Sequence, residues 1–309
     1  MSGLYHFFDR LYVCILKRVR PCDKQGSPVR HRRRKVRHEV LRYYKKNPTT
    51  DASLLKALDY LKHRPDAVVI PDEFREKYEY RRIELGIDGE GTPFWEMAEG
   101  KRLFFIPDEP DRVRKAINGL LIEQDIRSPH RFVVPGFDLG EDDIIADVGC
   151  AEGLVSLQYV DKVKKVYLFE SDPVWINILW KTFAPWGDKV KIVPKRVSDR
   201  DGLDGVRLDT YFKKEGVAPT FVKLDVEGEE PEVLDGMSGL LDAGRSMKIA
   251  VSTYHKQEEH AEIAQYAQKR GFRYETSEGW MLFGLYDMPH PPYFRRGMIR
   301  IWANWKDKH

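Results

Sequence analysis

The spacing of apolar and polar residues changes along the chain and divides it into three parts. Residues 1–46 combine apolar positions at helical spacing with a dense basic run, which predicts a basic amphipathic N-terminal arm. Residues 47–130 mix helical and alternating stretches and are expected to form a smaller α+β accessory region. Residues 131–309 repeat short apolar runs between amphipathic stretches, as strands alternating with helices do.

The last part predicts an α/β fold with a Rossmann-like, doubly wound sheet. Strands are expected over 143–149, 165–170, 189–198, 220–226 and 247–255, with two more within 272–286 and 297–305. Strands that are apolar throughout and alternate with helices are buried on both faces, so the seven strands should form a mostly parallel sheet. A Pro-rich loop joins the last two strands without a helix, which predicts an antiparallel last strand.

The accessory region has patterns of its own. Residues 53–64 and 109–125 have helical spacing, and alternating stretches around the turn-formers "DGEGTP" and "EGK" predict hairpins within 77–107.

Charge is distributed unevenly over the chain. The net charge is +3, but residues 1–46 alone carry fourteen Lys or Arg against three Asp or Glu. This arm could bind an anionic membrane surface or nucleic acid, or its apolar face could dock on the body and leave a solvated basic tail.

Composition narrows the setting of the protein. Three cysteines are too few for a disulfide framework, and no apolar run approaches the roughly 20 residues of a spanning helix. We therefore expect a cytoplasmic protein, with any membrane contact peripheral, on the inner face and made through residues 1–46. The sequence gives no indication of oligomeric state.

The first two strand ends predict a cofactor site, because ligands of such sheets bind at the carboxyl ends of the strands. "ADVGCAEG" places Asp147 before a turn bracketed by Gly149 and Gly153, and it lacks the dinucleotide fingerprint. An acid here suits an ammonium or sulfonium group better than a pyrophosphate. Glu170 ends the next strand, where an acid can bind a ribose diol.

Together these strand ends describe S-adenosylmethionine. Further candidate contacts with this cofactor are Glu152 and Ser171 in the same two loops, and Ser198 or Asp199 near the adenine at the end of the third strand.

The fourth strand ends in "FVKLDVEGEEPEVLDG", which is rich in acids. Asp225 and Glu227 are expected to face the reacting methyl group, and Gly228 lets the chain turn. Glu229 and Glu230 are instead expected to favour the start of the next helix.

These motifs resemble the FkbM family of S-adenosylmethionine-dependent methyltransferases. "ADVGCAEGLVSL", "VYLFESDP", "RLDTYF" and "FVKLDVEGEEPEVLDG" occur in the family's order and spacing, over roughly residues 134–273. The resemblance implies a class I methyltransferase fold and an O-methyltransferase acting on sugar hydroxyls of polysaccharides, glycolipids or nucleotide-sugar precursors. It places Asp147, Gly149, Gly153 and Glu170 at the cofactor, and Asp225, Glu227 and Gly228 at the mouth of the active site.

One position departs from the family pattern. The fifth strand of the family commonly ends E-x-H, whereas "VSTYH" keeps His255 and places Thr253 where the acid is expected. His255 is the predicted general base, because its ordinary pKa lies near neutrality. Asp225 could orient His255, act as the base itself, or ligate a divalent metal together with Glu227. The metal is not favoured, because no second oxygen-rich cluster is evident.

Three residues are candidates for binding the acceptor. His130 precedes the first strand in "SPHRF", and Tyr254 and Trp280 could stack on a sugar ring. Two other functions stay open: an RNA ribose methyltransferase that uses the basic arm, and a catalytically silent Rossmann-like interaction module. "DVEG" replaces the fourth motif usual in base aminomethylation, which argues against an exocyclic amine as the target but not against a ribose. Nucleic acid is the less favoured partner.

Overall fold

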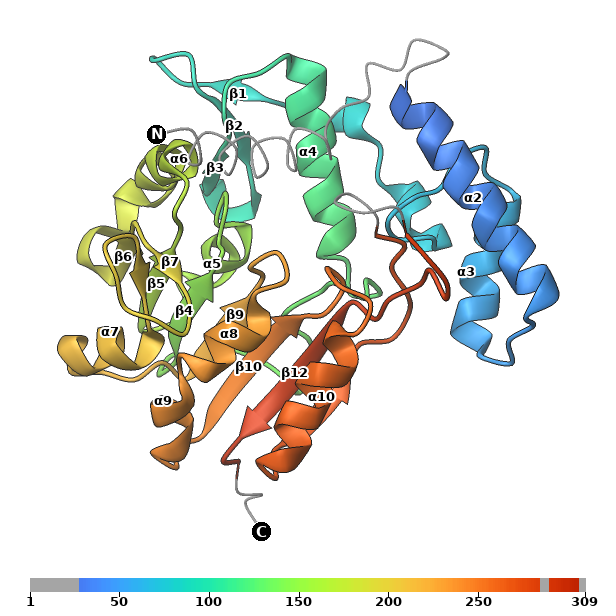
Figure 1. Ribbon diagram of the computed structural model, residues 1–309. Coiled ribbons are helices and arrows are strands. Elements are labelled where there is room, and N and C mark those ends of the chain that lie inside the picture. The colour runs from blue at the N-terminus through green and yellow to red at the C-terminus, as the bar shows by residue number, and fades with distance from the viewer. Residues whose placement is uncertain (1–27, 284–288, 306–309) are drawn as a thin grey trace. The chain divides into compact units, whose positions relative to one another are not determined.

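The computed structural model describes residues 28–283 and 289–305, which form two compact units (Figure 1). Unit 1 comprises the described residues within 28–84, 108–131 and 277–297, and unit 2 those within 85–107, 132–276 and 298–305. The predicted segment 47–130 is thus divided between both units. The amphipathic pattern over residues 4–16 lies outside the described residues, as does the rest of the arm before Pro28.

Unit 1 is mainly helical. Its elements are α2 (Pro28–Lys46), α3 (Ala52–Lys62), the 3-10 helices η1 (Glu73–Lys77) and η2 (Tyr80–Arg82), and α4 (Pro110–Glu123). The two predicted helices in this region are therefore confirmed as α3 and α4. Asp51 caps α3 by accepting the backbone N–H of Leu54 at 2.8 Å.

The described part of the basic arm is a packed helix. Val36 and Val40 of α2 are buried in an apolar cluster with residues of α3, including Leu54, Leu58 and Leu61. The cluster also holds Leu282, Tyr293 and Phe294. Residues 28–46 are thus part of the core of unit 1, whereas the apolar face of residues 4–16, on which the alternatives for this arm depend, lies outside the described residues. No helix within 28–283 or 289–305 is both long and apolar enough to cross a membrane.

A small antiparallel sheet opens unit 2. It consists of β1 (Gly86–Ile87), β2 (Pro93–Glu96) and β3 (Arg102–Phe104), with η3 (Ala98–Gly100) before its last strand. The hairpins predicted within 77–107 are confirmed.

The main sheet of unit 2 has seven strands in the order β11-β12-β10-β9-β4-β5-β6. They are β4 (Ile144–Val148), β5 (Lys165–Phe169), β6 (Val190–Val193), β9 (Phe221–Leu224), β10 (Met247–Ser252), β11 (Arg273–Thr276) and β12 (Met298–Ala303). β12 runs antiparallel to β10 and β11, and the pairs among β10, β9, β4, β5 and β6 are parallel. The expected sheet with an antiparallel last strand is confirmed.

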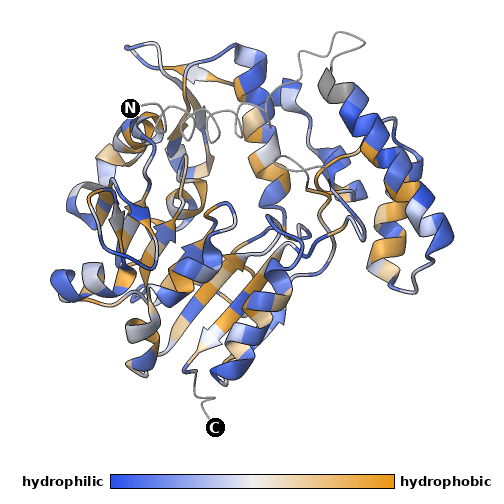
Figure 2. Cartoon of the chain, viewed as in Figure 1, coloured by the Kyte–Doolittle hydropathy of each residue, from blue (hydrophilic) through white to orange (hydrophobic). Residues whose placement is uncertain are grey.

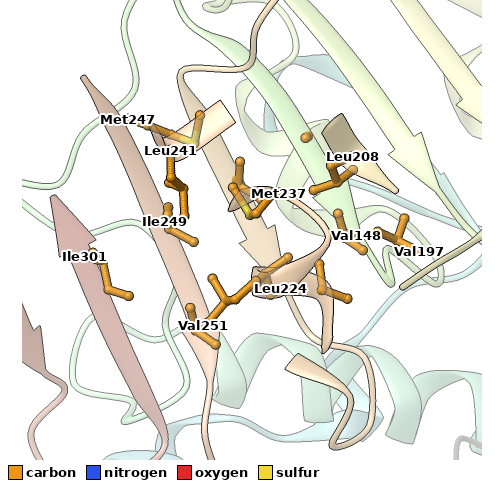
Figure 3. Close-up of a cluster of buried hydrophobic side chains, with 14 of the residues drawn as sticks. Val148, Val197, Leu208, Leu224, Met237, Leu241, Met247, Ile249, Val251 and Ile301 are labelled. Atoms are coloured by element: carbon orange, nitrogen blue, oxygen red, sulfur yellow. The ribbon is translucent and has the colours of Figure 1, made fainter. Parts of the chain in front are cut away.

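The strands of this sheet are mostly apolar (Figure 2), and helices cover it. They are α5 (Leu154–Tyr159), α6 (Pro173–Phe183), α7 (Leu208–Glu215), α8 (Glu230–Asp235), α9 (Ser238–Asp242) and α10 (Glu259–Lys269), with the 3-10 helix η4 (Ala184–Lys189). On one face, alternate residues of β4, β9, β10 and β12 pack against α7 to α10 (Figure 3).

The third strand of the main sheet ends earlier than expected. β6 stops at Val193, and Pro194, which has no N–H to donate to a strand ladder, follows it. Residues 196–197 form β7 (Arg196–Val197), which pairs with β8 (Gly205–Val206) in a separate two-stranded sheet. The expectation that Ser198 ends a main-sheet strand is therefore wrong.

Candidate active site

The predicted site residues of unit 2 gather where four neighbouring parallel strands end. The loop Gly149–Gly153 follows β4, Glu170 follows β5, Asp225 follows β9, and His255 comes shortly after β10. These four strands are adjacent in the sheet and parallel, so their carboxyl ends share one edge.

The loop after β4 depends on left-handed backbone. Gly149 has φ 70° and Gly153 φ 83°, and Ala151 between them has φ 47°. A Cβ atom on Gly149 would lie 2.2 Å from the carbonyl oxygen of Asp225. Only glycine therefore allows the loop to contact the backbone at the end of β9.

Asp147 is held by the fold. Its side chain is buried, Oδ2 accepts the hydroxyl of Ser156 at 2.8 Å, and Oδ1 lies 2.9 Å from Lys223 Nζ. Lys223 also donates to the carbonyl oxygen of Gly149 at 2.9 Å. The predicted cofactor contact of Asp147 stays a prediction, and what the structure adds is a buried ion pair that fixes the loop.

Lys223 is a residue to which the sequence analysis gave no role. Burial opposes its charge, but Asp147 and Asp225 together outweigh burial, so the pKa of Lys223 is raised. Its position within the otherwise apolar strand Phe221–Leu224 could have indicated a role, because a lysine that is buried needs a charged partner.

Glu170 is fixed by the backbone around it. Oε2 accepts the N–H of Ala151 at 3.0 Å, and Oε1 accepts those of Ser171 and Asp172 at 2.7 and 2.9 Å. Burial raises the pKa of this carboxyl, and the three N–H groups oppose the rise. Ser171 contacts Glu170 through its backbone, and half-buried Glu152 lies in the loop after β4.

Ser198 and Asp199 lie after β7. The hydroxyl of Ser198 accepts the N–H of Arg200 at 3.3 Å, and Asp199 pairs with the guanidinium of Arg200 at 3.2 Å. Their adenine contacts stay predictions.

Carboxylates from three elements surround His255. On the Nε2 side, Asp225 Oδ1 lies at 3.4 Å and Glu227 Oε2 at 3.6 Å. On the Nδ1 side, Glu230 Oε1 lies at 3.2 Å and Glu259 Oε2 at 3.8 Å. The imidazole itself is only 1% exposed, whereas Asp225 and Glu227 are partly exposed.

The turn after β9 aims these acids. Glu227 has φ 61°, a left-handed conformation that a side-chain-bearing residue rarely adopts, and Gly228 follows with φ 96°. Strained backbone of this kind is concentrated at functional sites.

The surrounding charges keep His255 protonated. Burial opposes the imidazolium, but the nearby carboxylates, Glu230 foremost, raise the pKa of His255 to about 10. Burial and then the charge of Glu230 raise the pKa of Glu259 to about 9. Burial also opposes the charge of Glu230, but the imidazolium together with hydrogen bonds from Glu259 and the Val226 N–H outweighs it, so the pKa of Glu230 is lowered.

Glu230 differs from its predicted role. It is the first residue of α8, but its side chain is fully buried and faces His255, so helix initiation does not account for it. Glu229 is partly exposed and pairs with Arg196, Nε to Oε2 at 2.8 Å. Glu259 was not predicted at all, although its position four residues after His255 was a usable signal.

The three candidate acceptor contacts are divided between the units. Tyr254 in unit 2 is fully buried, stacks beside His255 with ring centroids 4.1 Å apart, and donates its hydroxyl to Asp225 Oδ1 at 3.2 Å. The predicted sugar-stacking role thus falls on a ring with no exposed surface. In unit 1, Trp280 donates Nε1–H to Ser53 Oγ at 2.8 Å, and His130 is buried. The roles of those two residues stay predictions.

The cluster around His255 also contains atoms of the kind that ligate metal ions. Asp225, Glu230 and His255 each offer a ligand atom, and these atoms lie within 4.8 Å of one another. However, Asp225 faces Nε2 of the ring and Glu230 faces Nδ1. The acids therefore flank the imidazole from its two sides as an ion-pair cluster, and metal binding by Asp225 and Glu227 stays a prediction that is not favoured.

Comparisons with known proteins identify the same part of the chain. Residues 148–274 match the family model described as the methyltransferase FkbM domain. The matched residues include the loop after β4, Glu170, Asp225 and His255. No curated protein matches the chain.

Several solved structures are similar to the chain at low identity. A methyltransferase FkbM from Methylobacillus flagellatus KT is 16% identical, covers 64% of this chain and 56% of its own, and gives a TM-score of 0.44. An rRNA methylase from Streptococcus thermophilus is 14% identical, with 54% and 90% covered and a TM-score of 0.35. M. capricolum TrmK in complex with S-adenosyl-homocysteine is 14% identical, with 55% and 66% covered and a TM-score of 0.34.

Proposed function

We propose that this chain methylates a hydroxyl group of a sugar with S-adenosylmethionine as the donor, because residues 148–274 match the methyltransferase FkbM domain. Its fold is that of a class I methyltransferase, and methyl transfer is the activity of the family. The observation that carries the finer proposal is the pair of partly exposed carboxylates, Asp225 and Glu227, where the strands end beside the loop after β4.

The residues at this edge fit the cofactor. S-adenosylmethionine, when bound, supplies a methyl group activated by a positively charged sulfur. Glu170 is anchored by three backbone N–H groups, and a carboxylate with about four acceptor positions retains capacity for a ribose hydroxyl. The left-handed loop after β4 brings its backbone against Asp225, so cofactor and acceptor residues adjoin.

The acceptor hydroxyl needs a base, and the protonation of His255 favours Asp225 in this role. A base must begin the reaction without the proton, whereas a pKa of about 10 leaves His255 protonated at neutral pH. The Tyr254 hydroxyl donates to Oδ1 of Asp225, and His255 Nε2 lies 3.4 Å from the same oxygen. Both side chains therefore hold this carboxylate in place. Asp225 would accept the hydroxyl proton as the oxygen attacks the methyl group.

The charge of the mouth supports a sugar rather than an RNA acceptor. Asp225 and Glu227 can accept hydrogen bonds from neighbouring hydroxyl groups, as sugars offer. The same two negative charges would repel the phosphates that flank a ribose in RNA. Buried charges arranged around His255 are also costly to maintain, which argues against a silent interaction module.

The test is methyl transfer from radiolabelled S-adenosylmethionine to a panel of nucleotide-sugars, glycolipids, polysaccharide fractions and RNA. We expect label in a sugar-containing fraction, with the methyl ether located by mass spectrometry. Asp225→Asn should lower the rate by about 100-fold or more, the usual contribution of a general base. Asp235→Asn, which changes an exposed acid of α8, should leave the rate unchanged. Label confined to RNA, or full activity in Asp225→Asn, would overturn the proposal.

A further inference from the structure

Two buried carboxyl groups approach the Nδ1 side of His255, and the proposed reaction gives neither of them a task. Glu230 comes from the first residue of α8 and Glu259 from the first residue of α10. Both side chains are at most 1% exposed. Burying a carboxylate is costly, so each of them needs a compensating partner.

The two acids receive different donors. Glu230 Oε1 accepts the N–H of Val226 at 2.8 Å and lies 3.2 Å from His255 Nδ1. Glu259 Oε2 accepts the backbone N–H of His255 at 3.0 Å and lies farther from the ring nitrogen, at 3.8 Å. The close ion pair of the imidazole is therefore with Glu230.

The remaining oxygens indicate where a proton lies. Glu230 Oε2 and Glu259 Oε1 are both buried. Among the described residues, the opposite carboxyl group is the one donor that either oxygen has. Burial and the charge of Glu230 raise the pKa of Glu259 to about 9, whereas the pKa of Glu230 is lowered beside the imidazolium, so the pair holds one proton at neutral pH. A protonated Glu259 that donates to Glu230 satisfies both oxygens and leaves the negative charge beside His255.

We propose that Glu230 is a positioning residue for methyl transfer: it holds His255 through Nδ1, with protonated Glu259 as its support, so that Nε2 stays directed at Asp225 and Glu227. Tyr254, which follows β10, packs its ring against the imidazole, and Lys256 donates to the carbonyl oxygen of Gly228 in the turn that carries Glu227. The imidazolium thereby sets the position of the carboxylate that takes the proton. This inference rests on the proposed function for its catalytic consequence, although the arrangement itself does not depend on the acceptor.

The test compares two changes of equal size at the same buried place. Glu259→Gln keeps an N–H donor where protonated Glu259 has its O–H, so it should preserve the arrangement. Glu230→Gln keeps an acceptor for Val226 but removes the charge that faces Nδ1. Glu232→Gln changes an exposed acid on the same helix and is the control.

The first measurement reads the ring nitrogens of His255 by NMR of protein labelled with ¹⁵N-histidine, without any acceptor. In the wild type and in the Glu259 and Glu232 variants, both nitrogens should be protonated at pH 7 and stay so above pH 8. In Glu230→Gln, the pH at which the ring loses its proton should fall by at least one unit, a tenfold change in the dissociation constant. An equal fall in Glu259→Gln, or no fall in Glu230→Gln, would overturn the assignment.

The second measurement uses the acceptor fraction that proves active. Glu230→Gln should lower kcat about tenfold or more and leave the KM for S-adenosylmethionine within twofold, because the cofactor residues are untouched. A variant that is only less stable would show wild-type kcat at low temperature, which would refute a positioning role. If Glu230→Gln does not fold, the wild-type spectrum decides, since a neutral His255 at pH 7 contradicts the proposal. If no acceptor is methylated, the proposed function fails while the ring-nitrogen result still stands or falls alone.

Discussion

Lys223 carries its charge inside an apolar strand, where it contacts both Asp147 and the carbonyl oxygen of Gly149. Lys223→Met would fill similar space but leave Asp147 as a buried charge without its cation. We expect the free energy of unfolding to fall by about 3–5 kcal/mol, the usual cost of breaking a buried pair. Urea denaturation of the purified protein measures this.

Lys191→Met is the matched control for this change. Lys191 also lies in a strand of the main sheet, β6, but its ion pair with Glu215 is partly exposed. Its replacement should cost less than about 1 kcal/mol. Adding Asp147→Asn to Lys223→Met should restore part of the stability, because the unpaired charge is then removed. Equal losses in the two lysine variants would show that the pair does not stabilise the fold.

The loop between β4 and α5 depends on one close backbone contact. Gly149→Ala would place a methyl group 2.2 Å from the carbonyl oxygen of Asp225, in addition to the strain of φ 70°. Gly244→Ala has the same strain, with φ 71°, but open space around its Cβ. The control should therefore lose only about 1–2 kcal/mol of stability.

Gly149→Ala should lose more stability than the control and should also weaken the binding of S-adenosylmethionine, measured by isothermal titration calorimetry. Gly244→Ala should bind the cofactor as the wild type does. Identical behaviour of the two variants in both assays would mean that the contact with Asp225 has no effect on the loop.

The helices and strands of unit 2 could be predicted from sequence, because the apolar and amphipathic patterns that indicate them lie within short stretches of the chain. The end of the third strand could not, since extended chain resumes after Pro194 in β7, where Val197 is again apolar and buried. Glu229 and Glu230 look alike in sequence. Only the return of the chain through β10, which brings His255 beside one of them, makes Glu230 buried and leaves Glu229 partly exposed.

At the scale of the whole molecule, the His255 cluster makes stability depend on pH. In an unfolded chain His255 and Glu259 have ordinary pKa values of 6.5 and 4.5. In the fold, burial opposes the charge of His255 but the carboxylates raise its pKa to about 10. Burial and Glu230 raise that of Glu259 to about 9. The folded state therefore holds more protons than the unfolded chain between these limits.

The sign of the effect follows from this proton uptake. The contribution of His255 is complete below about pH 6.5 and is lost as pH approaches 10, and that of Glu259 declines between about pH 4.5 and 9. The free energy of unfolding from urea titrations should thus decrease steadily from pH 6 to pH 9. Glu259→Gln should reduce the slope, because one of the two groups no longer titrates. A free energy that is constant over this range would contradict the cluster.

The packing of Gly149 on the carbonyl of Asp225 has a consequence for kinetics. A donor that orders the loop after β4 also restrains the residue proposed to take the acceptor's proton, so the two substrates should not bind independently. Such coupling is reciprocal: each substrate should raise the affinity of the other by the same factor. Initial-rate kinetics would then follow a sequential pattern in which raising the concentration of either substrate lowers the apparent KM for the other.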